Sequence, residues 1–402
     1  MDEILSLNSD YFNAQKDEDV NLISVEKIIK KLQKHKIVKV TGLHHSKKTA
    51  TVYEAVKRIW ETRNCFYFNS QIYKNSRVAT AKGIVKLIDY AAQKKAFDST
   101  SILVFESIED IKHAKDVISE LYQKGKYRII LIGSLKHLHG LPHTKVLPPS
   151  IFDRIERRKL APYIDNYMVL WSLHPFNYSD MTWEQKNIRN MLTDSCIFHD
   201  VIMSHGVKDI FLYQSALSFM ARNIWKYLSL RDITKLINEW NLNTSIITMK
   251  DYIQCSLSAW FMHTLKRYDL KKEKKMDSKG SYYFWDLWIL ASIKKDAATK
   301  KYRLFENLLL LELLQLNYEV YTGMNGKFLF SFYTKKLWEK KCIHVSHQTD
   351  KKEIRKEINK LTKIKGKSQR FLVVENLEDL WLRKKDYQTV QLVSYLDILE
   401  II

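Results

Sequence analysis

The stretch Thr41-Gly42-Leu43-His44-His45-Ser46-Lys47-Lys48-Thr49 directly follows the apolar run Ile37-Val38-Lys39-Val40. Its spacing matches the phosphate-binding pattern G-x-x-x-x-G-K-[ST], which lies between a strand and a helix. Gly42 takes the place of the first glycine, Lys48 that of the lysine, and Thr49 that of the hydroxyl residue facing Mg²⁺. Lys47 stands where the second glycine belongs. We therefore expect a strand-to-helix turn derived from a phosphate-binding loop.

In such a loop, backbone N–H groups and the N-terminus of the following helix cradle the phosphates. The candidate nucleotide-binding residues are Gly42, Ser46, Lys47, Lys48 and Thr49. A side chain at position 47 costs on the order of 1 kcal/mol if the backbone φ angle there is positive. That lysine would either crowd the nucleotide or add a phosphate contact. The alternative is an ordinary basic strand-to-helix turn.

The composition indicates a folded protein with a large positive charge. The 402 residues suffice for two or three domains, and 46% of them are hydrophobic. The net charge of +21 attracts polyanions, usually nucleic acid, although a lysine-rich surface without a function gives the same count. No apolar run reaches the ~18 residues of a membrane span. The acidic N-terminus and the four dispersed cysteines predict a cytoplasmic protein with reduced thiols.

The first part of the chain alternates between expected strands and expected helices. This alternation is typical of a parallel sheet with both faces covered. The expected strands are 37–40, 65–68, 101–105 and 127–132, and the expected helices are 25–35, 49–62, 81–94 and 111–124. All five prolines lie between Pro142 and Pro175, so we expect irregular structure in that window.

The remainder begins with a helical stretch. Residues 183–269 read as helices, and the break at 241–248 before a helix over 248–268 fits a winged-helix or helix-turn-helix unit. The lysine-rich segment 270–280 reads as a linker. A small α/β domain follows it. Its expected helices are 303–316 and 351–363, and its expected strands are 318–321, 328–334, 342–345 and 370–375.

The order of short motifs resembles the prokaryotic AAA+ ATPase family whose C-terminal domain has a restriction-endonuclease-like fold. Residues 127–134 look like the sensor strand of that family, with Ile132 in place of a threonine, and 173–176 are similar to its segment after the ATPase core. Residues 230–233, 283–286 and 305–321 also resemble family motifs. The resemblance implies an α/β P-loop AAA+ core with a parallel sheet over residues 1–175. It further implies a helical winged-helix-like domain over 176–270 and a small endonuclease-like α/β domain over 281–402.

The resemblance implies two carboxylates after a buried strand, one for the metal and one for the attacking water. Here the run 102–105 is followed by Glu106 and Ser107. One register places Glu106 and Ser107 at the two acidic positions, and a one-residue slip places Phe105 and Glu106 there. Either register leaves one carboxylate, so we expect slow hydrolysis, with Glu106 and Thr49 as the metal contacts. A solvated acidic strand end is the alternative.

Other candidate sites carry weaker signals. Ser134, after the sensor-like strand, is the candidate for contact with the γ-phosphate or the water, although Gly-Ser is also common in turns. Glu306 matches the first acidic position of a nuclease site, but the strands 328–332 and 343–346 offer no further ligand. We expect a structural or surface role for Glu306 and no nuclease activity. His137, His139 and His143 have no cysteine or carboxylate at ligand spacing and are expected to form a surface cluster rather than a metal site.

The sequence thus predicts a diverged AAA+ ATPase-like protein, or pseudo-ATPase, that binds ATP and Mg²⁺ weakly or not at all. It would act by binding a protein partner or DNA. Lys250, Lys266 and Arg267 flank a helix with residues that could face bases or phosphates, namely Tyr252, Gln254 and Ser256. Two alternatives remain: an active P-loop ATPase coupled to DNA handling, and a basic scaffold protein without nucleotide.

Overall fold

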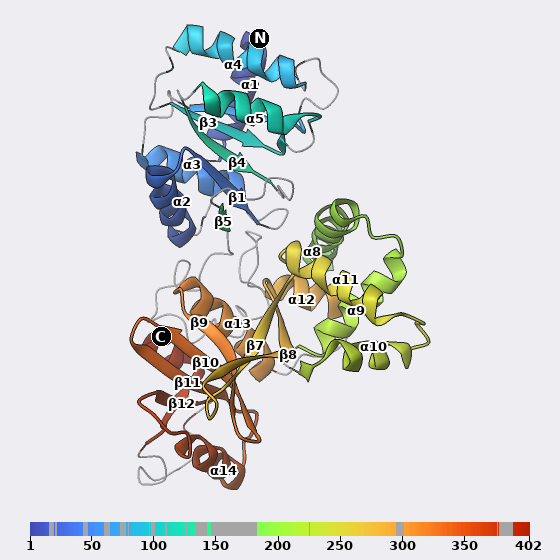
Figure 1. The fold of residues 1–402 in the computed structure, drawn as a ribbon, viewed down its shortest axis with the longest axis vertical. Coiled ribbons are helices and arrows are strands. Elements are labelled where there is room, and N and C mark those ends of the chain that lie inside the picture. The colour runs from blue at the N-terminus through green and yellow to red at the C-terminus, as the bar shows by residue number, and fades with distance from the viewer. Residues whose placement is uncertain are drawn as a thin grey trace. The chain divides into compact units, whose positions relative to one another are not determined.

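The computed structural model forms two compact units (Figure 1). The first comprises Met1–Pro149 with Leu173–Pro175, and the second comprises Ser150–Ser172 with Phe176–Ile402. The residues that the structure describes are 1–15, 20, 22–42, 47–59, 65–72, 78, 80–95, 97, 101–108, 111–124, 127–133, 143–145, 183–224, 226–294, 301–375, 377 and 389–402.

The first unit is built on a parallel sheet with the strand order β2-β3-β4-β1-β5. Its strands are β1 (Ile37–Thr41), β2 (Cys65–Asn69), β3 (Ile102–Glu106), β4 (Arg128–Ile132) and β5 (His143–Lys145). The expected parallel α/β core is confirmed, and β5 is an addition. The strand β4 lies between β1, which precedes the loop, and β3, which ends in Glu106. Because these strands are parallel, their carboxyl ends lie next to one another at the same end of the sheet.

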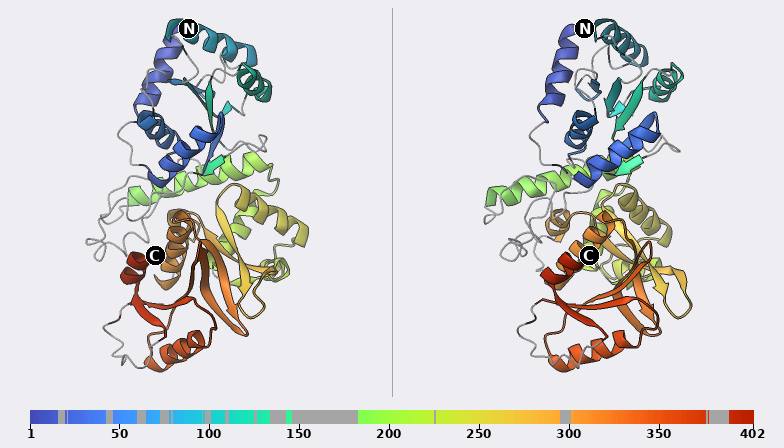
Figure 2. Two further views of the ribbon diagram at one scale, coloured as in Figure 1. Left: turned by 60° about the vertical axis from the view of Figure 1, so that its left-hand side comes forward. Right: turned by 90° about the vertical axis from the view of Figure 1, so that its left-hand side faces the viewer.

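Helices cover both faces of this sheet (Figures 1 and 2). The helices α2 (Leu22–Lys34) and α3 (Lys48–Ile59) pack on one face, and α4 (Ala81–Lys95) and α5 (Ala114–Gln123) pack on the other. Alternate residues of each strand pack against the helices on opposite faces of the sheet, because successive side chains of a strand point to opposite faces. Val104, for example, packs with α2 and α3, whereas Leu103 and Phe105 pack with α4 and α5.

A helix that the sequence analysis missed, α1 (Asp2–Asn13), packs beside β2 at the edge of the sheet. The ring of Phe12 stacks on that of Tyr67 in β2, with centroids 4.7 Å apart. The ring of Tyr11 stacks on Tyr67 with a centroid distance of 5.8 Å. At the other end of α1, the Asp2 carboxylate accepts hydrogen bonds from Tyr90 and Lys94 of α4. These contacts tie α1 to both a strand and a helix of the core.

The second unit contains one eight-stranded mixed sheet with the order β13-β12-β11-β10-β9-β7-β8-β6. Its strands are β6 (Tyr227–Leu228), β7 (Met262–Asp269), β8 (Lys274–Phe284), β9 (Glu319–Asn325), β10 (Phe328–Lys336), β11 (Glu339–Val345), β12 (Gln369–Val374) and β13 (Gln391–Ser394). Residues 176–270 and 281–402, which were expected as separate domains, contribute strands to this same sheet. The strand β7 joins the two sets because it pairs with both β8 and β9.

Two expectations about the middle of the chain were wrong. The expected helix over 248–268 ends at Ser258, and the chain then turns through Trp260, whose φ of 63° belongs to the left-handed region, into β7. The expected linker over 270–280 is a tight turn followed by β8, which pairs antiparallel with β7. The composition of this segment indicated a loop because its lysines face solvent. Its pairing partner, β7, lies outside the segment and could not be recognised from the local composition.

Helices complete the second unit. They are α8 (Trp183–Cys196), a π-helical segment over Ile197–Met203, α9 (Ile210–Arg222), α10 (Leu230–Asn238), α11 (Ile246–Ser258), α12 (Leu287–Lys294), α13 (Lys301–Gln315), α14 (Lys351–Thr362) and α15 (Tyr395–Ile401). The helix α13 is apolar on most sides and almost wholly buried, which identifies it as a core helix. Among the helices that the structure describes, none is long and apolar enough to cross a bilayer.

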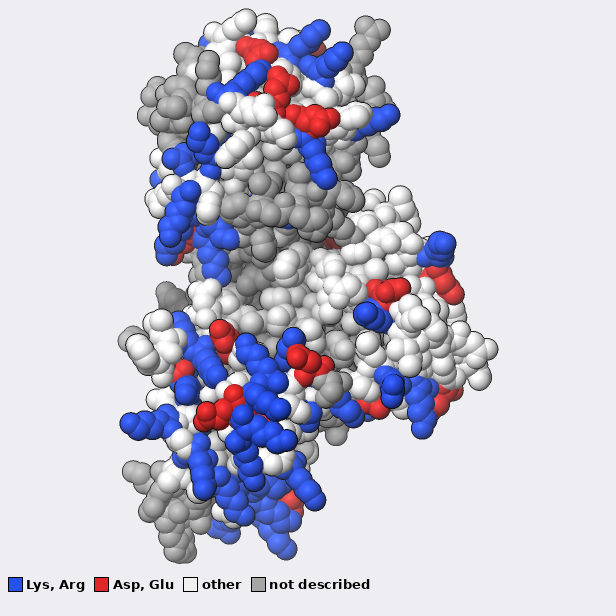
Figure 3. All heavy atoms as spheres, in the orientation of Figure 1, with Lys and Arg blue, Asp and Glu red and all other residues white. Residues whose placement is uncertain are grey.

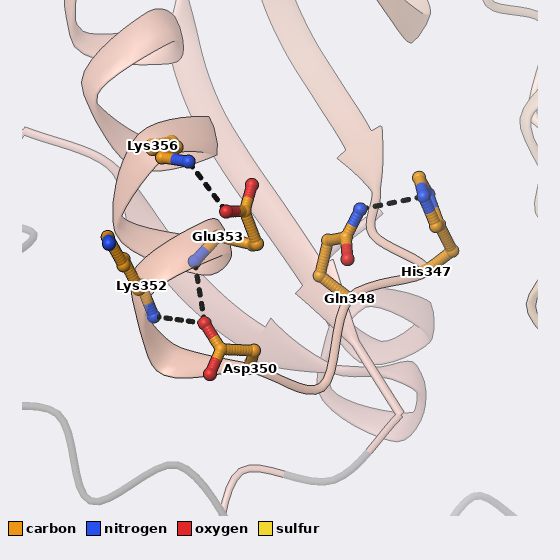
Figure 4. A network of polar contacts seen from close by, with 6 residues as sticks. All are labelled: His347, Gln348, Asp350, Lys352, Glu353 and Lys356. Atoms are coloured by element: carbon orange, nitrogen blue, oxygen red, sulfur yellow. Dashed lines mark hydrogen bonds and ion pairs between the residues drawn. The ribbon is translucent and has the colours of Figure 1, made fainter.

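The start of α14 shows how local sequence positions a basic helix on this sheet (Figure 4). The Asp350 carboxylate accepts hydrogen bonds from the backbone N–H groups of Lys352 and Glu353, at 2.8 and 3.1 Å. Such an N-cap satisfies backbone donors that the first helical turn leaves unpaired. Lys356 pairs with Glu353 one turn later at 2.6 Å. The apolar side of α14 then packs on the sheet through Ile354, Ile358 and Leu361.

Candidate functional site

The phosphate-loop motif lies where the sequence placed it, between the end of β1 at Thr41 and the start of α3 at Lys48. Lys47, in the place of the second glycine, has a φ of 55°. This left-handed conformation is the one that glycine adopts without steric cost. The Lys47 carbonyl accepts hydrogen bonds from the backbone N–H of Thr51 at 2.9 Å and from its hydroxyl at 2.8 Å. The backbone therefore keeps a glycine-like shape although a lysine occupies the position.

The lysine of the motif folds back across its own loop. The ammonium group of Lys48 donates a hydrogen bond to the carbonyl oxygen of Gly42 over 3.3 Å. This bond joins Gly42 and Lys48, the two ends of the segment 42–48. Ser46, also expected to bind phosphate, falls outside the described residues, as do His44 and His45.

The threonine of the motif reaches the acidic strand end. The Thr49 hydroxyl donates a hydrogen bond of 2.8 Å to Oε1 of Glu106, the last residue of β3. Phe105 is fully buried in the opposite layer of the core. Of the two registers that the sequence allowed, the geometry thus favours the one with Glu106 beside the loop and Ser107 at the following position.

A tyrosine that sequence reasoning missed holds the other oxygen of the same carboxylate. The Tyr67 hydroxyl donates to Oε2 of Glu106, and the phenol is 4% exposed. Burial raises the pKa of Tyr67 well above its ordinary value, and the negative charge of Glu106 adds to that effect. Tyr67 therefore stays protonated and acts as a donor. Asn69 of β2 pairs with Glu106 of β3. Because side chains alternate along a strand, Tyr67, two residues before Asn69, lies on the same face of the sheet as Glu106. This alternation is the sequence signal that could have identified Tyr67.

Ser107 continues the chain at the point where a second carboxylate was expected. Its φ of 55° lies in the left-handed region. Its backbone N–H donates to the Ile132 carbonyl at the end of β4 over 2.8 Å, and its carbonyl accepts from the Ser70 hydroxyl. These bonds attach the exits of β2, β3 and β4 to one another. Ser134, the expected sensor residue, lies outside the described residues.

The functional groups at the carboxyl ends of these strands fit a nucleotide with Mg²⁺. A lysine ammonium and a helix N-terminus suit phosphate oxygens, and Thr49 and Glu106 supply a hydroxyl and a carboxylate for a hard cation. No cluster of three or more His, Cys, Asp or Glu side chains with metal-ligand geometry occurs in the described part of the chain. That finding does not argue against Mg²⁺, because this ion is usually held by one or two protein groups together with waters and substrate phosphates.

Glu306 of the second unit is buried. It is 7% exposed and accepts a hydrogen bond from the Tyr283 hydroxyl over 3.1 Å. Burial raises the pKa of Glu306, opposed by a hydrogen bond from Ser331 and the nearby charge of His344. His344 also lies 3.6 Å from Glu357 of α14. Of the histidine cluster, only His143 is described, in β5.

Several of the residues proposed to face DNA in the middle of the chain make contacts within the protein, although only Ser256 among them is buried. The Tyr252 hydroxyl donates to the Asp209 carbonyl at 3.2 Å, and Ser256 is buried and bonded to Tyr213 at 2.8 Å. The guanidinium of Arg267 lies over the ring of Tyr227, 4.7 Å from its centroid. Lys266 pairs with Asp277 at 2.7 Å. On α11 itself, Lys250 and Gln254 remain exposed.

Comparison with known proteins places the loop within a recognised family region. Residues 34–163 match the family described as AAA domain. An uncharacterised protein of Haemophilus influenzae is 24% identical over 206 residues, which are 49% of this chain and 51% of that protein. The chain thus spans about half the length of the curated relative that it matches.

Solved structures give weaker matches. A Walker-type ATPase of Pyrococcus abyssi is 10% identical, with a TM-score of 0.48, over 67% of this chain and 94% of that chain. A signal-transduction ATPase with a tetratricopeptide-repeat sensor from Pyrococcus horikoshii is 11% identical, with a TM-score of 0.23, over 71% of this chain and 44% of that one. The match over residues 34–163 and the parallel sheet around the loop together support an AAA-type P-loop core in the first unit.

Proposed function

We propose that the first unit binds ATP together with Mg²⁺ at the loop 42–49 and hydrolyses it slowly. Lys48 and the N-terminus of α3 would hold the outer phosphates. Thr49 would contact the metal directly, and Glu106 would hold it through a water. The bound Mg²⁺ would neutralise charge on the phosphates. Ser134 remains the candidate for a sensor contact.

The observation that carries this proposal is the hydrogen bond between Thr49 and Glu106 at 2.8 Å. It brings together a hydroxyl and a carboxylate, the two kinds of protein group that hold the metal of a P-loop site. Lys48 supports the proposal, because its ammonium already lies across the loop, 3.3 Å from the Gly42 carbonyl. The φ of Lys47 supports it further, because this position keeps the left-handed conformation that the glycine of the pattern adopts.

Slow hydrolysis follows from the groups around Glu106. A carboxylate that orients the attacking water has no counterpart at Ser107, whose backbone is fixed to β2 and β4. Both oxygens of Glu106 already accept hydrogen bonds, from Thr49 and Tyr67, so this carboxylate is held in place rather than available as a base.

The test is nucleotide binding and turnover by the full chain. Isothermal titration with ATP and Mg²⁺ should show binding that Lys48→Ala abolishes, while Lys57→Ala on the same helix changes nothing. Ser107→Glu should raise turnover over the wild type, and Ser107→Ala should not. Absence of ATP binding by the wild-type chain would refute the proposal in favour of a scaffold without nucleotide. Turnover already at about 10 s⁻¹, the median for enzymes, would instead support a fully active ATPase.

For the second unit we propose a winged-helix-like arrangement followed by an endonuclease-like α/β fold without nuclease activity, acting on a protein partner or on DNA. The succession β6, α10, α11 and the β7–β8 hairpin supports the first part. The succession α13, β9, β10, β11, α14 and β12, with β11 parallel to β12, supports the second. Incubation of plasmid DNA with Mg²⁺ or Mn²⁺ should give no cleavage. Cleavage that Glu306→Gln removes would overturn this part.

A further inference from the structure

The tip of the β10–β11 hairpin presents two large apolar side chains to solvent. Leu337 is 91% exposed and Trp338 is 96% exposed, the highest values among the large hydrophobic residues that the structure describes. They form the two-residue turn between Lys336 and Glu339, which pair across the hairpin. The next highest exposed fraction is that of Ile247 on α11, at 73%. Folding gains nothing from a tryptophan that buries almost no surface.

The backbone of this turn makes the choice of residues more unusual. Leu337 has a φ of 52°, in the left-handed region. Two-residue hairpin turns favour glycine, asparagine or aspartate at such positions because a larger side chain meets steric repulsion there. A sequence selected only for a stable hairpin would place a small or polar residue at 337. Residues that break a local rule without a structural gain are expected at functional positions.

Lysines surround the apolar tip on both strands. The segment from Lys335 to Lys341 contains four lysines and one acid. That acid, Glu339, accepts a hydrogen bond from Tyr318 over 2.7 Å and lies 3.7 Å from the ammonium of Lys341. Lys335 and Lys340 are directly opposite each other in the hairpin register. The positive charge at the tip is therefore only partly balanced within the hairpin.

The basic surface extends beyond the hairpin over a cluster of tyrosines. The ammonium of Lys335 lies 4.2 Å from the ring centroid of Tyr268, and that of Lys275 lies 4.9 Å from the ring centroid of Tyr321. The rings of Tyr268 and Tyr321 are themselves 5.6 Å apart. Lysines from β8 and from the β10–β11 hairpin thus converge on one aromatic cluster.

This lysine-rich face is visible on the second unit in Figure 3, where blue side chains gather over the region of α14 and the strands β7 to β12. On α14, Lys360 lies over the ring of Phe328, 5.6 Å from its centroid. Four of the five residues from Lys271 to Lys275 are lysines. A surface that is basic over several elements suits an extended polyanion better than a small anion.

We propose that the Leu337–Trp338 tip contacts unpaired bases of a nucleic acid, while the surrounding lysines contact its phosphates. An exposed indole offers a stacking face to any base, and lysine acts as a point charge that reads no sequence. The expected ligand is therefore single-stranded nucleic acid of any sequence. A membrane is less well matched, since two apolar side chains form a far smaller apolar face than an interfacial helix inserts. The proposal specifies the nucleic-acid part of the proposed function and does not depend on the nucleotide site.

The test uses the full chain and a fluorescein-labelled single strand of roughly 16 nucleotides, read by fluorescence anisotropy. Trp338→Ala should weaken binding about tenfold, and Trp338→Phe should restore most of the affinity, because stacking supplies that much per base. Tyr122→Ala, on α5 of the first unit and 52% exposed, is the matched control for loss of an exposed aromatic side chain and should leave Kd unchanged. A duplex of the same sequence should bind more weakly than the single strand and should be insensitive to Trp338→Ala.

Salt and a second set of variants separate the two kinds of contact. The Kd should rise steeply between about 50 mM and about 200 mM salt, and Lys335→Gln with Lys340→Gln should reduce that dependence. Lys82→Gln on α4 of the first unit is the control and should leave it unchanged. Lys48→Ala should bind the oligonucleotide normally, which distinguishes failure of this proposal from failure of the nucleotide site. No oligonucleotide binding at low salt, or equal binding by Trp338→Ala, would overturn the proposal. So would Trp338-dependent binding to phosphatidylserine vesicles alone.

Discussion

Thr49 donates its hydroxyl hydrogen to Glu106 over 2.8 Å, although the two residues lie 57 positions apart in the sequence. The bond connects the first turn of α3 with the end of β3, across a sheet edge where β4 also ends. Tyr67 approaches the same carboxylate from β2. The result is a carboxylate fixed from two sides, and its behaviour with and without a cation can be tested directly.

Tyr67→Phe should lower the thermal stability of the first unit. The substitution leaves one oxygen of Glu106 without its donor, and such a loss costs on the order of 1–3 kcal/mol. Addition of ATP and Mg²⁺ should recover part of the loss, because a metal-bound water would replace the missing donor. Differential scanning calorimetry with and without ligand measures both effects. Tyr53→Phe, in the same aromatic cluster beside Phe12, serves as the control. A Tyr67→Phe melting curve identical to that of the wild type would contradict this account.

Substitutions at Lys47 should respond to backbone shape rather than to charge alone. Lys47→Val should destabilise the first unit by roughly 1–2 kcal/mol, because a β-branched residue tolerates the φ of 55° poorly. Lys47→Gly should remain within about 1 kcal/mol of the wild type, since relief of strain is offset by a more flexible unfolded chain. Chemical denaturation of the two variants measures the difference. Equal stability of the valine and glycine variants would show that the angle is not maintained in solution.

Glu306→Gln should remove a pH dependence of the second unit. Burial raises the pKa of Glu306 in the folded state above that in the unfolded state. The folded state thus favours the protonated carboxyl, and its contribution to stability, complete below the unfolded pKa, is lost as the pH rises through the folded pKa. The melting temperatures of the wild type and Glu306→Gln should therefore differ least near pH 4, about the unfolded pKa of a glutamate, and Glu306→Gln should become the more stable of the two as the pH rises.

The comparison requires a carboxylate outside the core. Glu239→Gln at the exposed end of α10 should leave the pH profile of melting unchanged. A wild-type profile that stays flat over this pH range would mean that Glu306 does not titrate in it.

Gly323→Ala should destabilise the second unit by about 1–3 kcal/mol, as for other overpacked sites. A Cβ at Gly323 would overlap the ring of Phe330, its partner in the β9–β10 register. The ring is 2% exposed and has little room to move. Phe330→Ala alone should cost about 3–5 kcal/mol. In a double-mutant cycle the combined substitution should cost less than the sum of the two, because the smaller residue at 330 removes the overlap. Additive effects would argue against this contact.

The features that were predictable from the sequence are those with short-range causes. The apolar run before Thr41 predicted the strand at the loop, and the apolar spacing after Lys48 predicted the helix. The four apolar residues before Glu106 predicted a buried strand with this carboxylate at its end. The contact of Tyr67 with Glu106 was not predictable in the same way. It depends on β2 lying beside β3, and the stacking of Tyr67 on α1 depends on a helix more than fifty positions away in the sequence.

The errors in the middle of the chain have a physical reason as well. The apolar pattern of α11 continues into Phe261, Met262 and Leu265, which are buried because β7 lies inside a sheet rather than because the helix continues. The reversal occurs at Trp260, a residue type that gives no turn signal. The lysines of β8 were read as a linker for the complementary reason, because a solvent-facing strand can carry the composition of a loop.

The position of β7 between β8 and β9 limits how this protein can be divided for experiments. A fragment that ends near residue 270 would contain β7 with the pairing groups on both of its sides uncovered. A fragment that starts near 281 would retain β9, but the backbone groups with which β9 pairs with β7 would be uncovered. Uncovered strands of this kind associate with other chains, so both pieces should be recovered mainly as aggregates. Truncations that keep residues 183–402 together respect the sheet, and they are the pieces in which the basic hairpin can be studied apart from the phosphate loop.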